Sequence, residues 1–148
     1  MRLAVPFVLP LALLTACSKA PEEKAFQVPE GLLPGSNEML KAPIQAAPDL
    51  EVTVSDVIIP PGATVPAHSH PGEEFVYVVE GSAVHVEQGK PDRPVEAGEA
   101  MVITPGAVHA PRGGPDGARA IVFRVHKKGQ PERIDAPAPD ATATASRD

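Results

Sequence analysis

The sequence predicts an all-β fold, a sandwich or a barrel, on three observations. Between residues 51 and 126, short runs rich in β-branched and aromatic residues alternate with turns that contain glycine or proline, a pattern typical of such folds. No amphipathic helix longer than one or two turns is visible in that region. The chain of 148 residues holds four phenylalanines, one tyrosine and no tryptophan, so we expect a core packed mainly from β-branched side chains.

The predicted strands follow one another closely along the chain. Their expected ranges are Glu51–Ile59, Glu74–Val79, Ser82–Glu87, Ala100–Thr104 and Ala118–Val125. Between the second and the third, Glu80-Gly81 is expected to form a two-residue hairpin turn. In the fourth run the sequence leaves two inward-facing pairs open, which are Met101 with Ile103 and Ala100 with Val102.

Proline-rich segments flank this region. Five of the 19 prolines lie within residues 18–50, which is typical of a semi-extended spacer, and Ser36–Lys41 could form a single helical turn there. The segment after residue 127 combines Pro, Ala, Thr and Asp and predicts a disordered tail. We therefore expect a linker at 17–48, a folded domain at 49–127 and a tail at 128–148.

Residues 1–16 have the features of a secretory signal. Arg2 precedes the uncharged, apolar run Leu3–Leu14, which is too short for a membrane span of about 20 residues. The tetrapeptide Leu14-Thr15-Ala16-Cys17 follows at once and resembles the lipobox of bacterial lipoproteins. This resemblance implies cleavage before Cys17 and lipidation of its side chain. The alternative is an ordinary signal peptide with a chance cysteine.

A lipid anchor at Cys17 implies a location in the bacterial cell envelope, with a membrane as one partner. Because Ser18 follows the cysteine, where an Asp would favour the inner membrane, the resemblance favours the periplasmic side of the outer membrane in a Gram-negative host. The formal charge of −6 argues against nucleic acid, which needs a basic surface. The single cysteine excludes an internal disulfide and any multi-cysteine metal site.

A cluster of histidines carries the clearest chemical signal. His68, His70 and Glu74 share the same parity, so in an extended strand their side chains project to one face. A further imidazole, His109, follows the turn at Pro105-Gly106. Imidazole is a ligand for Zn, Cu, Fe and Ni. Taken alone, however, the His-x-His pair is better explained by a surface loop.

The spacing of these residues resembles that of a known family. Gly62 to Gly81 reads G-x5-H-x-H-x3-E-x6-G, which is similar to the first cupin motif over its full length. The second motif of that family, G-x5-P-x-G-x2-H-x3-N, is matched with two departures, a threonine at the proline position and a glycine at the asparagine position. The residues at its positions are Gly98, Thr104, Gly106, His109 and Gly113.

The resemblance covers about half of the chain and implies a cupin jelly-roll β-barrel, also called a double-stranded β-helix, between disordered proline-rich flanks. It also implies one divalent transition metal per chain, held inside the barrel. Mn, Fe, Ni, Cu or Zn remain open, although a purely structural Zn is disfavoured because such sites are closed and usually contain cysteine. The implied ligands are His68, His70, Glu74 and His109.

The strand after the first motif predicts part of the cavity wall. With Glu74 facing inward, alternation turns Val76 and Val78 inward as well. A hairpin at Glu80-Gly81 would then bring His85 onto the same face, as a substrate-facing or metal-supporting group. A shift of one residue would instead expose His85 and bury its neighbours, which are Val84 and Val86.

Two functions follow from these residues, both with a small-molecule partner. The first is a metal-dependent oxidoreductase, dioxygenase-like, acting on a small apolar or aromatic substrate. The alternative is a non-catalytic protein of the cell envelope that binds a metal or a small ligand. A third function, with less support, is that of an isomerase or epimerase that uses His85 as general base. Because the core is small, a homodimer is expected.

The lipid anchor can be tested directly. Cys17→Ser removes the thiol that the lipid would modify, so we expect no lipidation and an unprocessed precursor in the membrane fraction. Mass spectrometry of that fraction measures both. A variant that is cleaved normally and released would show a conventional signal peptide instead.

Overall fold

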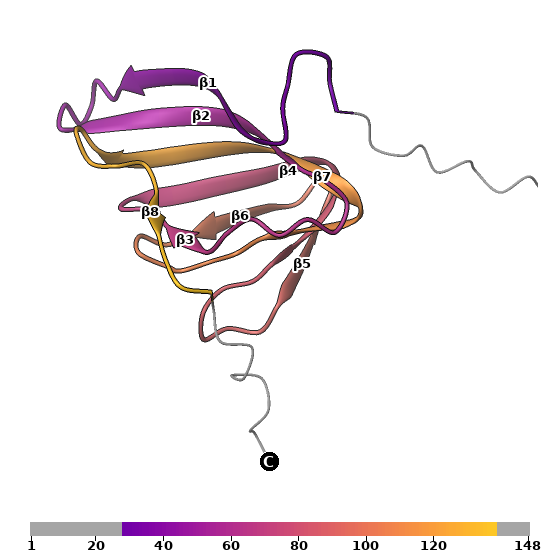
Figure 1. Ribbon diagram of the computed structural model, residues 1–148. Coiled ribbons are helices and arrows are strands. Elements are labelled where there is room, and N and C mark those ends of the chain that lie inside the picture. The colour runs from indigo at the N-terminus through magenta and orange to yellow at the C-terminus, as the bar shows by residue number, and fades with distance from the viewer. Residues whose placement is uncertain (1–27, 139–148) are drawn as a thin grey trace, which may run out of the picture.

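The computed structural model describes residues 28–138, and every regular element in that range is a β-strand (Figure 1). Among these residues there is no helix long and apolar enough to cross a membrane. The expected signal segment and Cys17 lie outside the described residues. In order, the strands are β1 (Gly35–Pro43), β2 (Leu50–Ile59), β3 (His68–Ser69), β4 (Glu73–His85), β5 (Arg93–Glu96), β6 (Ala100–Ile103), β7 (Arg112–Lys127) and β8 (Ile134–Asp135).

The strands form two antiparallel sheets. The large one has the order β1-β2-β7-β4-β5, with β6 paired to another part of β4, and the small one consists of β3 and β8. The large sheet curls, so that its β1 end and its β5 end lie on opposite sides of the molecule, with β3 and β8 between them (Figure 1). Its buried inner face carries aliphatic core residues, including Ile59, Val78 and Val122.

The prediction of a hairpin turn at Glu80-Gly81 is wrong. Strand β4 runs through this dipeptide and pairs with β7 on both sides of it, with register shifts between Val78 and Glu80 and between Gly81 and Ala83. Gly81 has a φ of +70°, which suits a β-bulge as well as a tight turn. A hairpin there would have paired Val76 with His85 and Val78 with Ala83, but Val76 and Val78 pair instead with Val122 and Ala120 of β7.

The bulge changes which residues of β4 face the interior. Up to Val78 the even positions face inward, and beyond the bulge the odd positions do, because one extra residue reverses the alternation. His85 is accordingly buried and lines the internal cavity together with Ala83. The bulge, rather than a hairpin, turns His85 inward, and its role at the site stays a prediction.

Two segments expected to be irregular are strands. The stretch read as linker, with a helical turn over Ser36–Lys41, forms β1 and pairs with β2. Most of its side chains are exposed, so it carries no hydrophobic alternation and is held at the sheet edge by backbone hydrogen bonds. In the predicted tail, β8 pairs with β3. Order therefore extends past 49–127 at both ends, and independent folding of that unit stays a prediction.

The close approach of β4 and β7 at the bulge can be tested with a matched pair of glycines. A Cβ at Gly81 would lie 2.2 Å from the carbonyl oxygen of Gly117, whereas one at Gly89, which has a similar φ of +77°, meets nothing within 4 Å. Gly89→Ala should lower the free energy of unfolding only by the strain of the left-handed conformation, about 1–2 kcal/mol. Gly81→Ala should lower the free energy of unfolding, measured in urea, by clearly more. Equal losses would mean that the contact imposes no constraint.

Candidate metal centre

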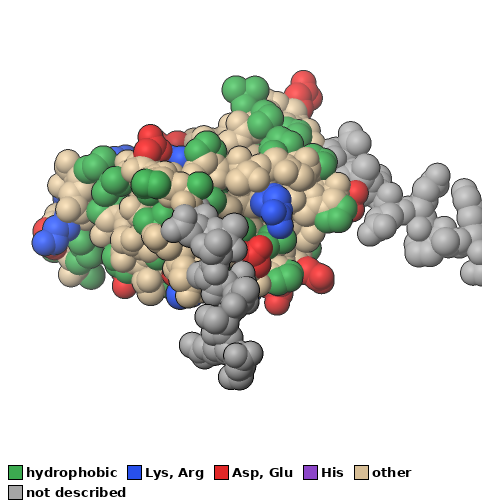
Figure 2. Space-filling model, turned by 60° about the horizontal axis from the view of Figure 1, so that its bottom comes forward, with side chains coloured by type: hydrophobic (Ala, Val, Ile, Leu, Met, Phe, Trp, Pro, Cys, Tyr) green, Lys and Arg blue, Asp and Glu red, His purple; other side chains and the backbone are tan. Residues whose placement is uncertain are grey.

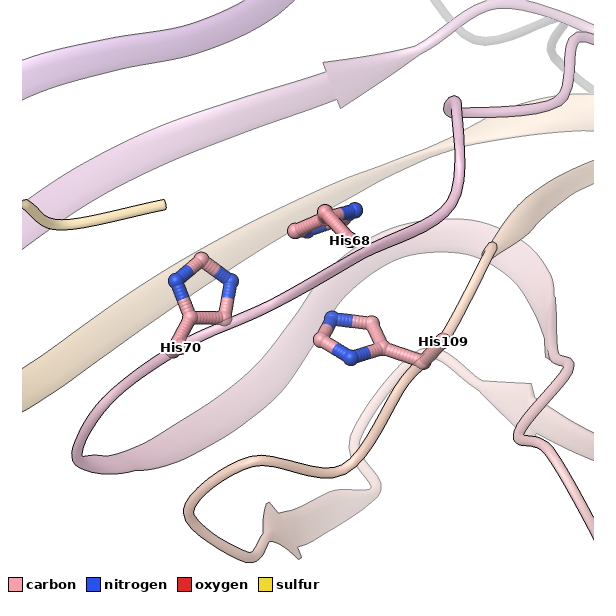
Figure 3. Close-up of side chains that lie close together, drawn as sticks. All are labelled: His68, His70 and His109. Carbon is pink, nitrogen blue, oxygen red and sulfur yellow. The ribbon is translucent and has the colours of Figure 1, made fainter. Parts of the chain in front are cut away.

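Three imidazoles converge in the interior. His68 lies on β3, His70 follows that strand directly, and His109 precedes β7, and the three rings point toward one another (Figure 3). Their candidate ligand nitrogens lie within 4.8 Å of one another, so the three side chains could hold one metal ion. All three are buried, and no histidine of the described residues shows on the face in Figure 2.

Backbone contacts hold the two ligand-bearing segments together. The amide of His68 donates to the carbonyl of His109 at 3.0 Å, and the amide of His109 donates back at 2.8 Å. In the turn before His109, the amide of Gly106 donates to the carbonyl of His70 at 2.8 Å. These contacts explain why a His-x-His strand and a Pro-Gly turn, distant in the sequence, meet at one point.

Each imidazole is oriented by a backbone carbonyl. In all three rings Nδ1 faces a carbonyl oxygen, which can only accept, so the neutral ring carries its proton on Nδ1 and leaves Nε2 free as a ligand. The carbonyls belong to Pro66 for His68 (2.8 Å), to Ala107 for His109 (3.0 Å) and to Glu132 for His70.

Glu74, the fourth expected ligand, lies beside the cluster. Its Oε2 accepts a hydrogen bond from Nε of Arg124 at 2.9 Å and lies 2.8 Å from Nε2 of His70. That Nε2 is buried and has no hydrogen-bond partner among the described residues. Two electron-pair donors in such close contact repel each other unless a proton or a metal cation lies between them. The residues therefore fit a bound metal ion.

The protonation states agree with this assignment. Burial lowers the pKa of the His68 imidazole to about 4 and also lowers the pKa of His109. Burial alone would raise the pKa of the Glu74 carboxyl, but a proton on the neighbouring His70 nitrogen and the charge of Arg124 bring it to about 2. At neutral pH, His68 and His109 are neutral imidazoles and Glu74 is a carboxylate, which are the states that bind a divalent transition metal.

A cavity of about 490 Å³ adjoins the histidines, a volume suited to a small molecule. Its wall is mostly aliphatic and includes Val76 and Val78. The cavity also shows which side chains of β6 face inward. Met101 and Ile103 line it, whereas Val102 is 54% exposed.

His85 lies on this wall near the three clustered histidines. The centre of its ring is 5.7 Å from that of His109. Its Nε2 lies 3.0 Å from Oε2 of Glu87, and the other oxygen of that carboxylate pairs with Lys90 at 2.7 Å. Sequence reasoning missed Glu87, although its position two residues after His85 would have placed both side chains on one strand face.

Two more charged residues at the site were missed. Arg124 was not singled out, although alternation along β7 puts it on the inward face after Ala118, Ala120 and Val122. Glu132 lies in the segment read as a tail, and no local signal marks it. Together they connect the C-terminal segment to the ligands, since Arg124 Nη1 donates to Oε1 of Glu132 at 2.8 Å.

Comparisons with known proteins agree with this architecture. Residues 55–123, just under half of the chain, match the family model of the cupin domain. A cupin-like protein from Thermotoga maritima shares 28% identity over 62% of this chain and 69% of that chain, with a TM-score of 0.51. These comparisons support a cupin-like jelly-roll fold, and the predicted fold class is confirmed.

Two further solved structures share the fold at lower identity. A protein with a double-stranded β-helix domain from Klebsiella pneumoniae is 19% identical over 76% of this chain and 92% of that chain, with a TM-score of 0.54. Oxalate decarboxylase from Bacillus subtilis is 18% identical over 70% of this chain and 28% of that chain, with a TM-score of 0.53. No curated protein matches the sequence.

The metal ligands can be tested by substitution. His68→Ala, His70→Ala and His109→Ala should each weaken metal binding by more than about 100-fold, because even groups that only orient a ligand contribute 10–100-fold. Metal content after dialysis, measured by mass spectrometry, gives the result. His126→Gln, which changes a buried histidine outside the cluster, should retain its metal. One ion per chain in the triple alanine variant would contradict the assignment.

Proposed function

We propose that this protein is a mononuclear metal-dependent oxidoreductase, dioxygenase-like, that acts on a small apolar or aromatic molecule. The observation that carries the proposal is the convergence of three buried imidazoles beside an aliphatic cavity of about 490 Å³. His68, His70 and His109, joined by Glu74, would hold one divalent transition metal, which supplies Lewis-acid and redox chemistry when bound.

The rest of the cavity supplies binding and proton transfer. Its aliphatic wall excludes water and favours an apolar substrate, because burial of apolar surface stabilises the complex by about 25 cal/mol per Å². His85 is the group placed to move a proton at the substrate. With Nε2 held by Glu87, its Nδ1 is left to accept a proton, in the arrangement typical of a histidine base oriented by a carboxylate.

A non-catalytic role in binding a metal or small ligand is the second candidate. The observation that favours it is that the charged groups beside the cavity are already paired, Arg124 with Glu74 and Glu132 and His85 with Glu87. In either case we propose that the lipid anchor at Cys17 holds the domain at the cell envelope.

We also propose that the protein is a homodimer. The outer face of β4, β6 and β7 exposes a group of large apolar side chains that a second copy could cover. These are Phe75, Tyr77, Val102 and Phe123.

Oxygen consumption tests the enzymatic proposal. Protein loaded with Fe, Mn, Ni or Cu is supplied with a panel of small aromatic and apolar compounds, and metal-dependent O₂ uptake is expected with some of them. His109→Ala should abolish it. His85→Leu should keep its metal but lose about 100-fold or more in kcat, since general acid–base catalysis contributes 10²–10⁴.

The alternatives give different results in the same assay. A ligand that raises the Tm without O₂ uptake or product under any metal would support the binding role and contradict the enzymatic one. Turnover without O₂ uptake, still lost in His85→Leu, would indicate an isomerase. His126→Leu controls for loss of a buried histidine elsewhere and should leave O₂ uptake unchanged.

A further inference from the structure

The C-terminal strap, which we define as residues 130–136, lies against the strand that carries the metal ligands. Its two-residue strand β8 pairs with β3, so that Asp135 lies opposite His68 and Ile134 opposite Ser69. The amide of Ala136 extends this pairing by donating to the carbonyl of Ala67 at 3.0 Å. Figure 1 shows β8 beside β3, under the ends of the long strands. The strap is thus part of the site's framework.

Glu132 connects this strap to two candidate ligands. Its backbone carbonyl accepts the hydrogen bond from Nδ1 of His70. Its carboxylate accepts from Nη1 of Arg124 at 2.8 Å, and Nε of the same guanidinium donates to Glu74 at 2.9 Å. The backbone and the side chain of this one residue therefore reach the site by separate routes.

The backbone route orients His70. His68 and His109 each bond to a carbonyl two residues earlier in their own segment, so their orientation is local. The acceptor for His70 is supplied by Glu132, 62 residues away. His70 consequently has its Nδ1 partner only when the strap is docked, and without it the ring is free to rotate or to change tautomer.

The side-chain route sets the charge balance at Glu74. A buried guanidinium needs a compensating carboxylate, since an unpaired buried charge is costly. Arg124 divides its donors between Glu74 and Glu132. Loss of the Glu132 charge would leave Arg124 with Glu74 as its anionic partner, and that pairing competes with a metal for the same carboxylate.

We propose that Glu132 is a positioning residue of the metal centre and that docking of the strap completes the site. The inference rests on the proposed metal site, because it assumes that an ion is bound by His68, His70 and His109. It adds a function to a segment that lies outside both cupin motifs.

Binding of Co²⁺ alone to the mature protein tests the inference. Glu132→Gln should weaken binding about 10-fold and shift the visible Co²⁺ absorption bands, and a chain ending at Gly129 should lose up to roughly 100-fold. Asp135→Asn is the matched control, because this strap carboxylate is exposed and its ion pair is with Arg133 at 2.8 Å. It should bind Co²⁺ like the wild type, as should a chain ending at Ala138.

The outcomes separate this inference from the metal site itself. Far-UV circular dichroism and the Tm of the metal-free proteins show whether each variant is folded. If the shortened chain does not fold, the Co²⁺ affinity of Glu132→Gln alone decides whether the positioning role holds. If Glu132→Gln and the shortened chain bind Co²⁺ with unchanged affinity and spectrum, the positioning role is overturned and the metal site stands. If the wild type binds no Co²⁺, the metal site is overturned as well.

Discussion

The pair of hydrogen bonds between the backbones of His68 and His109 is the interaction on which the rest of the site depends. Strand β3 has only two residues, far fewer than a strand that is stable by itself. It is held by His109 on one side and by β8 on the other. Because an imidazole can move only as far as its backbone allows, this bridge fixes the positions of two candidate ligands relative to each other before any ion binds. Such preorganisation is what a functional metal site requires.

The buried charges show how the barrel interior departs from a purely apolar core. Arg124, Glu74 and Glu132 form one connected group, although replacing buried ion pairs with apolar residues is often neutral or stabilising. A requirement for stability alone would therefore not explain them. Their contact with His70 does offer a reason, since the same carboxylate that balances Arg124 also faces a ligand nitrogen.

The sequence predicted the parts of the fold that leave a local or fixed-spacing signal. Strands β2, β6 and β7 show β-rich runs, and the spacing of the two motifs places His68, His70 and His109 together. Gly81 led to a wrong turn prediction, because a glycine with positive φ suits a turn and a bulge equally, and only the partner strand decides between them. Strand β1 has no alternation since its side chains are mostly exposed. Glu132 acts through contacts with residues distant in the sequence, which no local pattern reveals.

The polarity of the inner face changes steadily along β2 and β7, and this change explains where the candidate metal site lies. At one end of the two strands the inward pairs are aliphatic, with Ile59 opposite Ala118 and Val57 opposite Ala120. In the middle Ser55 lies opposite Val122. At the other end the pairs are polar or charged, with Thr53 opposite Arg124 and Glu51 opposite His126. Glu74 lies opposite Arg124 on the other side of β7, where the aliphatic wall gives way to charged groups. An ion held there would contact the apolar cavity on one side and its charge-balancing groups on the other. A substrate could then be desolvated in the aliphatic half while the charge of the site stays compensated in the polar half.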